Sequence, residues 1–224
     1  MAASALVLAL KDVRKSYAGE AVLKGVNLSV SEGEFVGIYG RSGSGKSTLL
    51  RLMGLLDRPT SGSVEVLGSD ASALSDSGAA RIRRERLGYV FQGFNLIPHV
   101  TALENVEIPM WLTGVSKEER ERRALADLER FGLERLAGRY PAEMSHGEQQ
   151  RVAAIRAMAN RPGLILADEP TSALDDESAK VLIDLMARFN RELRTTVVMV
   201  STSEEEAKAG TTVYRLSSGS LGRG

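Results

Sequence analysis

Short runs of apolar residues alternate along the chain with stretches in which apolar residues recur at helical spacing. Each run is bounded by glycine, acidic or polar residues, as is typical of strands that are buried on both faces of a sheet. The clearest runs cover residues 35–39, 164–167 and 197–200. Strands that alternate with helices indicate an α/β fold with a mainly parallel sheet.

Helical spacing is clearest in the segment 176–193, just before the last of these strands. An apolar face that recurs every three to four residues predicts an amphipathic helix. We assign this face to Val181, Leu185, Met186 and Phe189. Further helices are expected at 49–56, 79–87, 117–131 and 145–160.

Three other segments depart from the regular alternation. Residues 6–14 and 22–30 are predicted to form paired edge strands, and residues 213–221 a terminal hairpin. The charged helix 117–131 and the apolar loop before it interrupt the succession of strands and helices. We therefore expect a helical lobe inserted into the α/β core.

Length and composition fit one globular domain with such a lobe. The chain has 224 residues, of which 43 % are hydrophobic and 26 % charged, and this excludes disordered, collagen-like and coiled-coil proteins. We predict a single domain over 1–224, with the core at about 1–92 and 161–224 and the helical lobe at about 93–160.

Charge and residue usage exclude several further classes of function. Lys and Arg total 29, as do Asp and Glu, so no basic excess indicates a nucleic-acid partner. The chain has no cysteine and two histidines, which excludes disulfides, thiol catalysis and a zinc site of the usual Cys/His kind. No stretch reaches 18 consecutive apolar residues, so we expect no membrane span.

Residues 40–48, Gly-Arg-Ser-Gly-Ser-Gly-Lys-Ser-Thr, match the phosphate-binding pattern G-x-x-x-x-G-K-[ST]. Glycines let successive N–H groups curl around an anion, and the following helix directs its positive end at it. A flexible glycine turn is the alternative, but a strand before the loop and a helix after it favour a phosphate site. The binding candidates are Gly40, Ser42, Gly43, Ser44, Gly45, Lys46, Ser47 and Thr48, and the Ser47 hydroxyl is also a candidate ligand of Mg²⁺.

The apolar strand at 164–167 ends in two carboxylates, Asp168 and Glu169. Ligands of open α/β folds bind at the carboxyl edge of the sheet, so both acids are expected beside the phosphate-binding loop. Asp168 is a candidate Mg²⁺ ligand, directly or through water. Glu169 is a candidate for polarising an attacking water. The alternative is that the two acids only cap the next turn.

A helix start at 145–148 offers a second candidate anion site. Ser145 and Glu148 have the spacing of a capping box, which by itself is a structural feature. A capped helix start that contains a glycine, here Gly147, also binds anions. These residues alone leave both interpretations open.

In this order and at these spacings, the motifs resemble the nucleotide-binding subunits of ABC transporters over nearly the whole chain. The resemblance implies a P-loop NTPase core of the α/β class, with an antiparallel β subdomain and an inserted helical lobe. It also implies an ATPase that acts as a homodimer and binds ATP and Mg²⁺ at two sites between its subunits.

The resemblance assigns roles to five further positions. Tyr17 matches the aromatic residue that stacks on adenine, with a core tyrosine as the alternative. Gln92 matches the glutamine that contacts Mg²⁺ and senses the membrane partner. Ser145 and Gly147 match signature residues that contact the γ-phosphate bound by the other subunit, and Asp175 lies in a loop that crosses the dimer interface.

Two segments, 54–62 and 91–98, resemble the macrolide-exporter and lipoprotein-releasing group of the family. That group works with an integral membrane permease that has few transmembrane helices and a large extracytoplasmic domain. The chain is then expected in the cytoplasm, peripheral on the inner face of the cell membrane. Phe94, Leu96, Ile97 and Pro98 are expected to form a surface that docks the permease.

The chain departs from the family at two positions. His146 replaces the first glycine of the signature, and Thr202 stands where the family has a histidine. That histidine bridges the γ-phosphate and the catalytic carboxylate, so its absence predicts slow hydrolysis. The catalytic candidates are Glu169, Gln92 and Thr202, and the metal ligands Ser47, Gln92 and Asp168.

The sequence thus predicts the ATP-driven subunit of a membrane transporter. A first alternative is a regulator that dimerises with ATP and signals through a membrane partner without transport. A second is a soluble tandem ATPase acting on ribosomes or DNA. The single cassette, without a long coiled-coil insertion, argues against the second alternative.

Overall fold

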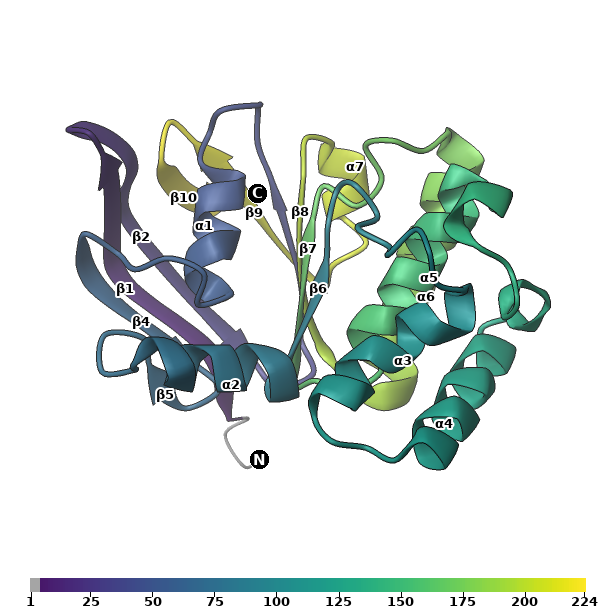
Figure 1. Ribbon diagram of the computed structural model, residues 1–224. Coiled ribbons are helices and arrows are strands. Elements are labelled where there is room, and N and C mark those ends of the chain that lie inside the picture. Colours follow the sequence, from purple (N-terminus) through teal and green to yellow (C-terminus); the bar gives the residue numbers. More distant parts are fainter. Residues whose placement is uncertain (1–4) are drawn as a thin grey trace.

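A six-stranded sheet runs through the middle of the molecule, and helices cover both of its faces (Figure 1). The computed structural model describes residues 5–224. The strand order is β10–β9–β3–β8–β7–β6, and all neighbouring strands are parallel except β9 and β10. These strands are β3 (Phe35–Tyr39), β6 (Leu87–Val90), β7 (Leu164–Asp168), β8 (Thr196–Ser201), β9 (Thr212–Ser217) and β10 (Ser220–Arg223).

The central strands are buried on both faces because successive side chains enter different cores. In β7, Leu164 and Leu166 belong to the core that contains α1, while Ile165 and Ala167 belong to the core that contains α5 and α6. All four side chains are fully buried. This double burial explains the uninterrupted apolar runs of the sequence. The three helices are α1 (Lys46–Met53), α5 (His146–Met158) and α6 (Asp176–Leu193).

A second, antiparallel sheet packs over α1, with the order β2–β1–β4–β5. The predicted α/β class with a mainly parallel sheet and an antiparallel β part is confirmed. The expectation that both N-terminal strands are edge strands is wrong for β1, because β4 pairs along its other side. These strands are β1 (Leu6–Tyr17), β2 (Glu20–Ser31), β4 (Ser61–Val66) and β5 (Ser69–Asp70).

Helices α3 and α4 lie on the right of Figure 1, on the same side of the central sheet as α5 and α6. Helix α5 contacts α3, α6 and β6. The lobe boundaries at about 93 and 160 stay a prediction. Within the described part of the chain, no helix has the length and apolar character needed to cross a membrane. The remaining helices are α2 (Asp76–Arg86), α3 (Ala102–Leu112), α4 (Lys117–Arg130), α7 (Glu204–Ala207) and the 3-10 turns Glu134–Leu136 and Pro141–Glu143.

Helix α6 has the predicted bounds, but its buried face differs from the prediction by one position. Leu182, Leu185, Met186 and Phe189 are buried, whereas Val181 is 42 % exposed. Residues 182, 185, 186 and 189 recur at the period of a helix and cover an arc of about 100° around its axis, and Val181 lies outside this arc, about 40° beyond Leu185. The assignment of Val181 to the apolar face is therefore wrong.

Candidate functional site

The carboxyl ends of β3, β7 and β8 meet at one edge of the central sheet. The backbone N–H of Gly40, after β3, donates to the Ser201 carbonyl at 3.1 Å. The N–H of Glu169, after β7, donates to the Val200 carbonyl at 3.0 Å. These two bonds bring the phosphate-binding loop, the acid pair and the end of β8 together, as expected for a parallel sheet.

The loop delivers its N–H groups directly into the start of α1. Gly45 has φ 104°, a conformation open to glycine, and no side chain caps the helix that begins at Lys46. Among residues 5–224, the N–H groups of Lys46, Ser47 and Thr48 have no hydrogen-bond acceptor. A helix start with free N–H groups is a site for an anion.

The Lys46 side chain is the most deeply buried charge at this edge, with 3 % exposure. Its ammonium donates to the carbonyls of Gly40 at 2.8 Å and Arg41 at 3.1 Å. The same ammonium forms an ion pair with Glu169 at 3.0 Å. A buried lysine held between loop carbonyls and one carboxylate is poised to exchange these partners for phosphate oxygens.

Asp168 and Ser47 form the second polar pair of the site. The Ser47 hydroxyl donates to the Asp168 carboxylate at 3.2 Å. Burial raises the pKa of Asp168, an effect that the Ser47 hydrogen bond and the Lys46 charge oppose. Mg²⁺ takes one or two protein oxygens together with phosphate oxygens and water, so this hydroxyl and carboxylate match its needs.

Two observations test whether a nucleotide phosphate fits these residues. The Ser44 hydroxyl is buried and has no hydrogen-bond partner within the described part of the chain. Buried polar atoms are usually paired, so an orphan in this loop indicates a ligand that completes it. Together with the free N–H groups at the helix start, the Ser44 hydroxyl lines a cradle whose chemistry fits phosphate. Ser42 lies exposed on the outer side of the loop.

Glu169 has a strained backbone. Its φ is 42°, an uncommon value for a residue with a side chain. Its carbonyl accepts hydrogen bonds from the N–H of Ser172 at 3.2 Å and from the hydroxyl of Ser172 at 3.0 Å. Strain of this kind concentrates at functional sites, where surrounding contacts hold it.

Tyr17 lies at the end of β1, near the first turn of α1. The residue is 43 % exposed, so it is not a core tyrosine. Its hydroxyl donates to Asp57 at 2.6 Å. Burial and the neighbouring Asp57 raise the pKa of Tyr17. An exposed aromatic ring close to Thr48 of the loop is available to stack on a base.

Ser145, Gly147 and Glu148 lie on the other side of the sheet, at the start of α5. The capping box is confirmed: Glu148 accepts from the Ser145 N–H at 2.9 Å, and this bond lowers the pKa of Glu148. A Cβ at Gly147 would approach the Ser178 hydroxyl of α6 to 2.8 Å, so the position needs glycine. Asp175 caps α6 and accepts from the Ser178 N–H at 2.8 Å.

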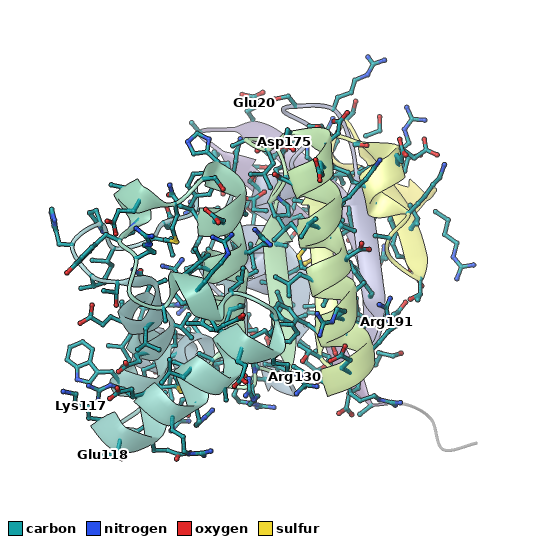
Figure 2. All side chains as sticks on the ribbon, turned by 90° about the vertical axis from the view of Figure 1, so that its right-hand side faces the viewer. Glu20, Lys117, Glu118, Arg130, Asp175 and Arg191 are labelled. Atoms are coloured by element: carbon teal, nitrogen blue, oxygen red, sulfur yellow. The ribbon has the colours of Figure 1, made fainter. Side chains whose placement is uncertain are left out.

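Within a single chain, these residues are not bonded to the phosphate-binding loop. No hydrogen bond or ion pair within the described residues connects Ser145, Gly147 or Glu148 to residues 40–48. Figure 2 shows Asp175 at the same end of the molecule as Glu20, which follows the turn after Tyr17, and opposite Arg130 and Arg191. Asp175, on one face of the sheet, and the strand end that carries Tyr17, on the other face, thus lie at the same end of the molecule.

Gln92 and Thr202 are exposed, and no hydrogen bond of their side chains is found among residues 5–224. The neighbours of Gln92 are firmly held. Gln150, buried on α5, donates to the carbonyls of Phe91 and Pro170, both at 2.8 Å. It thereby ties the strand end before Gln92 to the turn after Glu169.

Arg156 of α5 holds the next turn of the same loop. It donates to the carbonyls of Phe94 at 3.0 Å and Asn95 at 2.5 Å, residues with φ 22° and 50°. Desolvation lowers its pKa. Sequence analysis missed Gln150 and Arg156. A polar side chain on the buried face of a helix, as at Gln150, is a signal that could have found one of them.

The expected docking loop is partly exposed. Ile97 is 45 % exposed, while Phe94 and Leu96 are half-buried. Leu96 packs against the core, and the Phe94 ring contacts the His146 ring at a centroid distance of 5.3 Å. Ile97 and Leu112 line a groove of about 570 Å³ between the loop, α2, β6, α3 and α5.

Comparisons with known proteins agree on one family. A family model described as ABC transporter matches residues 23–172. The ABC transporter ATP-binding protein MJ0796 of Methanocaldococcus jannaschii is 46 % identical over 97 % of this chain and 96 % of its own length. A dimeric structure of a post-hydrolysis state of MJ0796, bound to ADP and Pi, is similar with a TM-score of 0.87, 46 % identity and coverage of 96 % of this chain and 97 % of that chain.

A relative named as an ATP-binding/permease protein matches over part of its length. The pyoverdine export ATP-binding/permease protein PvdT of Pseudomonas fluorescens is 45 % identical over 89 % of this chain. The match spans 31 % of PvdT.

Proposed function

The chain belongs to the ABC transporter family, and we propose that it is the ATP-hydrolysing subunit of a membrane transporter that acts as a homodimer on the inner face of the cell membrane. The observation that carries this proposal is the position of Lys46. Its ammonium lies 2.8 Å from a loop carbonyl and 3.0 Å from Glu169, beside the Ser47–Asp168 pair. These are the groups that phosphoryl transfer needs at one point.

Each residue of the group has one task in this proposal. Lys46 and the free N–H groups of the loop bind the β- and γ-phosphates of ATP. Ser47, Asp168 and Gln92 would hold Mg²⁺, which would neutralise the charge that develops on the phosphates. Glu169 accepts the proton of the attacking water.

Two copies of the chain are needed to complete a site. Ser145, Gly147 and Asp175 lie across the sheet from α1, so they reach a γ-phosphate only from a second copy. The dimeric structure of MJ0796 supports this arrangement. In the proposed dimer of this chain we place two nucleotides. Each lies between the phosphate-binding loop of one subunit and α5, the signature helix, of the other.

We further propose slow hydrolysis. The exposed Thr202 makes no hydrogen bond within residues 5–224, although residue 201 is bonded to the loop. The threonine side chain is shorter than that of histidine, and its hydroxyl stays neutral near pH 7. A stabiliser of the γ-phosphate is therefore missing. Slow hydrolysis also favours the alternative function, a dimer that signals through its partner without transport.

The membrane partner is proposed to be a permease with few transmembrane helices and a large extracytoplasmic domain, so that transport is export or work done outside the membrane. The resemblance of residues 54–62 and 91–98 to the macrolide-exporter group supports this, as does the match to an export protein. The groove beside Ile97 and Leu112 supports docking there, because contiguous exposed apolar side chains are typical of interfaces.

Replacing Lys46 tests the nucleotide site. Lys46→Ala is expected to abolish tight binding of ATP·Mg²⁺ in calorimetry, because the phosphates lose their buried positive charge. Lys208→Ala, at an exposed lysine paired with Glu204, is the matched control and should bind like the parent. Unchanged affinity in Lys46→Ala would exclude the proposed site.

Acidic substitutions in the groove test whether the membrane partner docks there. The identity of that partner then separates transport from signalling. Ile97→Glu with Leu112→Glu is expected to release the chain from the membrane protein that co-purifies with it, while ATP affinity stays unchanged. Val181→Glu, at an exposed apolar residue of α6, is the control. Retained association would place docking elsewhere. A partner with an efflux duct indicates transport, and a wall hydrolase attached to the partner indicates signalling.

A further inference from the structure

The hydroxyl of Tyr17 is anchored by a residue that no motif singles out. It donates to Asp57 Oδ2 at 2.6 Å. The other carboxylate oxygen, Oδ1, accepts from the Lys15 ammonium at 2.6 Å and from the Arg58 N–H at 2.7 Å. Three donors therefore hold both oxygens of one carboxylate.

The segment that carries Asp57 is also bonded to β1 through other residues. The segment after α1 runs alongside β1: the Thr60 N–H donates to the Arg14 carbonyl at 2.8 Å, and the Ser16 N–H donates to the Thr60 hydroxyl at 3.0 Å. The Asp57 side chain is 19 % exposed. A half-buried carboxylate with charged and neutral donors forms strong, directional hydrogen bonds.

Lys15 also occupies one face of the Tyr17 ring. Its ammonium lies 4.8 Å from the ring centroid, within the range of a cation–π contact. It also donates to the Arg58 carbonyl at 2.8 Å, so it is not free to leave the ring. A base can then approach Tyr17 only from the opposite face.

We propose that Asp57, together with Lys15, is a positioning residue for the nucleotide base: it holds the Tyr17 ring in one orientation, with a single face open for stacking. This inference rests on the proposed stacking of Tyr17 on adenine. The ionisation states agree with it. Burial and Asp57 raise the pKa of Tyr17, which keeps the donating proton on the hydroxyl. Burial of Asp57 acts against ionisation, but the hydrogen bonds from Lys15 and Tyr17 outweigh it and lower the pKa of Asp57.

Without the bond to Asp57, binding of the nucleotide must also immobilise the Tyr17 side chain, which weakens the affinity for the nucleotide. Immobilising one side chain on binding weakens affinity by about threefold to tenfold. Loss of the whole stacking contact, as in Tyr17→Ala, weakens it by about fivefold to a hundredfold. The phosphates bind elsewhere, so their contribution should not change.

The experiment compares ADP with inorganic pyrophosphate, both with Mg²⁺, by calorimetry on the full chain. Neither probe is hydrolysed at this site, and pyrophosphate has no base. Asp57→Asn and Tyr17→Phe should each weaken ADP binding by about threefold to tenfold and leave pyrophosphate binding unchanged. The double variant should lose no more than Tyr17→Phe alone, because the substitution at position 57 acts through the hydroxyl that Tyr17→Phe has already removed.

Asp76→Asn is the matched control. Asp76 is a neighbouring acid that pairs with exposed Arg58 and makes no contact with Tyr17. Equal loss of ADP and pyrophosphate affinity in Asp57→Asn would overturn the inference, since a general disturbance of the loop would then explain it. Unchanged ADP affinity in Asp57→Asn and Tyr17→Phe, with a loss in Tyr17→Ala, would overturn positioning but retain stacking. Unchanged ADP affinity in Tyr17→Ala would overturn the stacking role itself and the inference with it.

Discussion

A histidine at position 202 should accelerate hydrolysis. Position 202 directly follows β8, whose last carbonyls accept the N–H groups of Gly40 and Glu169 at 3.1 and 3.0 Å. Residue 202 therefore follows the two carbonyls that bond to the loop and to the backbone of Glu169, the proposed catalytic residue. The Thr202 side chain is exposed and without a hydrogen bond in the described part of the chain, so replacing it breaks no hydrogen bond.

The magnitude follows from the role of one added donor. Removing one stabiliser of a developing negative charge from a preorganised site typically costs about a hundredfold to a thousandfold in turnover, or about 3–4 kcal/mol. Position 202 is solvent-exposed in the single chain, so the donor is less preorganised than in a buried site. We therefore expect Thr202→His to raise turnover by about tenfold to a hundredfold, which is less than the full effect of such a donor.

The assay is steady-state phosphate release at saturating ATP·Mg²⁺, with and without the membrane partner. Thr202→Ala is the control and should turn over like the parent, because the threonine hydroxyl has no partner to lose. Affinity for ATP should be similar in all three proteins. No gain in Thr202→His, with a parent that already turns over about ten times per second, would refute the reasoning that a stabiliser is missing.

Three further predictions concern the scaffold of the site. Phe189→Ala should lower the free energy of unfolding in urea by about 3–5 kcal/mol, since its ring is fully buried against Phe131, whereas exposed Val181→Ala should stay within about 0.5 kcal/mol of the parent. Arg156→Ala should raise hydrogen exchange at 94–97 and cost about 1.5–3 kcal/mol of unfolding free energy, as two bonds from a charged donor are lost; unchanged exchange would show that the turn holds itself. Burial raises the pKa of Asp168, so the folded chain binds a proton more tightly there than the unfolded chain, and Mg²⁺-free stability from this group should fall as pH rises through the raised pKa; urea unfolding at several pH values should show this slope in the parent and not in Asp168→Asn.

Much of the central sheet and of the phosphate site could be predicted from local patterns. Strands β3 and β7 coincide with uninterrupted apolar runs because both of their faces are buried. The loop at 40–48 and the capping box at Ser145 are signals that consist of residues close together in the sequence. The acid pair follows because the end of a buried strand must reach the sheet edge.

What sequence patterns missed depends on contacts between distant segments. The interior position of β1 depends on pairing with β4, and no pattern within β1 shows it. The Tyr17–Asp57 bond joins residues far apart in the chain, one of which lies in an irregular segment. Helix α7 has four residues, too few for helical periodicity to appear. The buried Gln150 holds two turns that are adjacent only in the fold.

The most direct test of the account is the mass of the chain in solution with ATP. The central claim is that ATP is bound between two copies, by the loop of one and the signature helix of the other. Glu169→Gln should bind ATP·Mg²⁺ without hydrolysing it, so light scattering should show a doubling of mass from the 24.1 kDa of the single chain. Adding Lys46→Ala, or Ser145→Arg, should keep the protein monomeric. A Glu169→Gln protein that binds ATP tightly and stays monomeric would contradict the account.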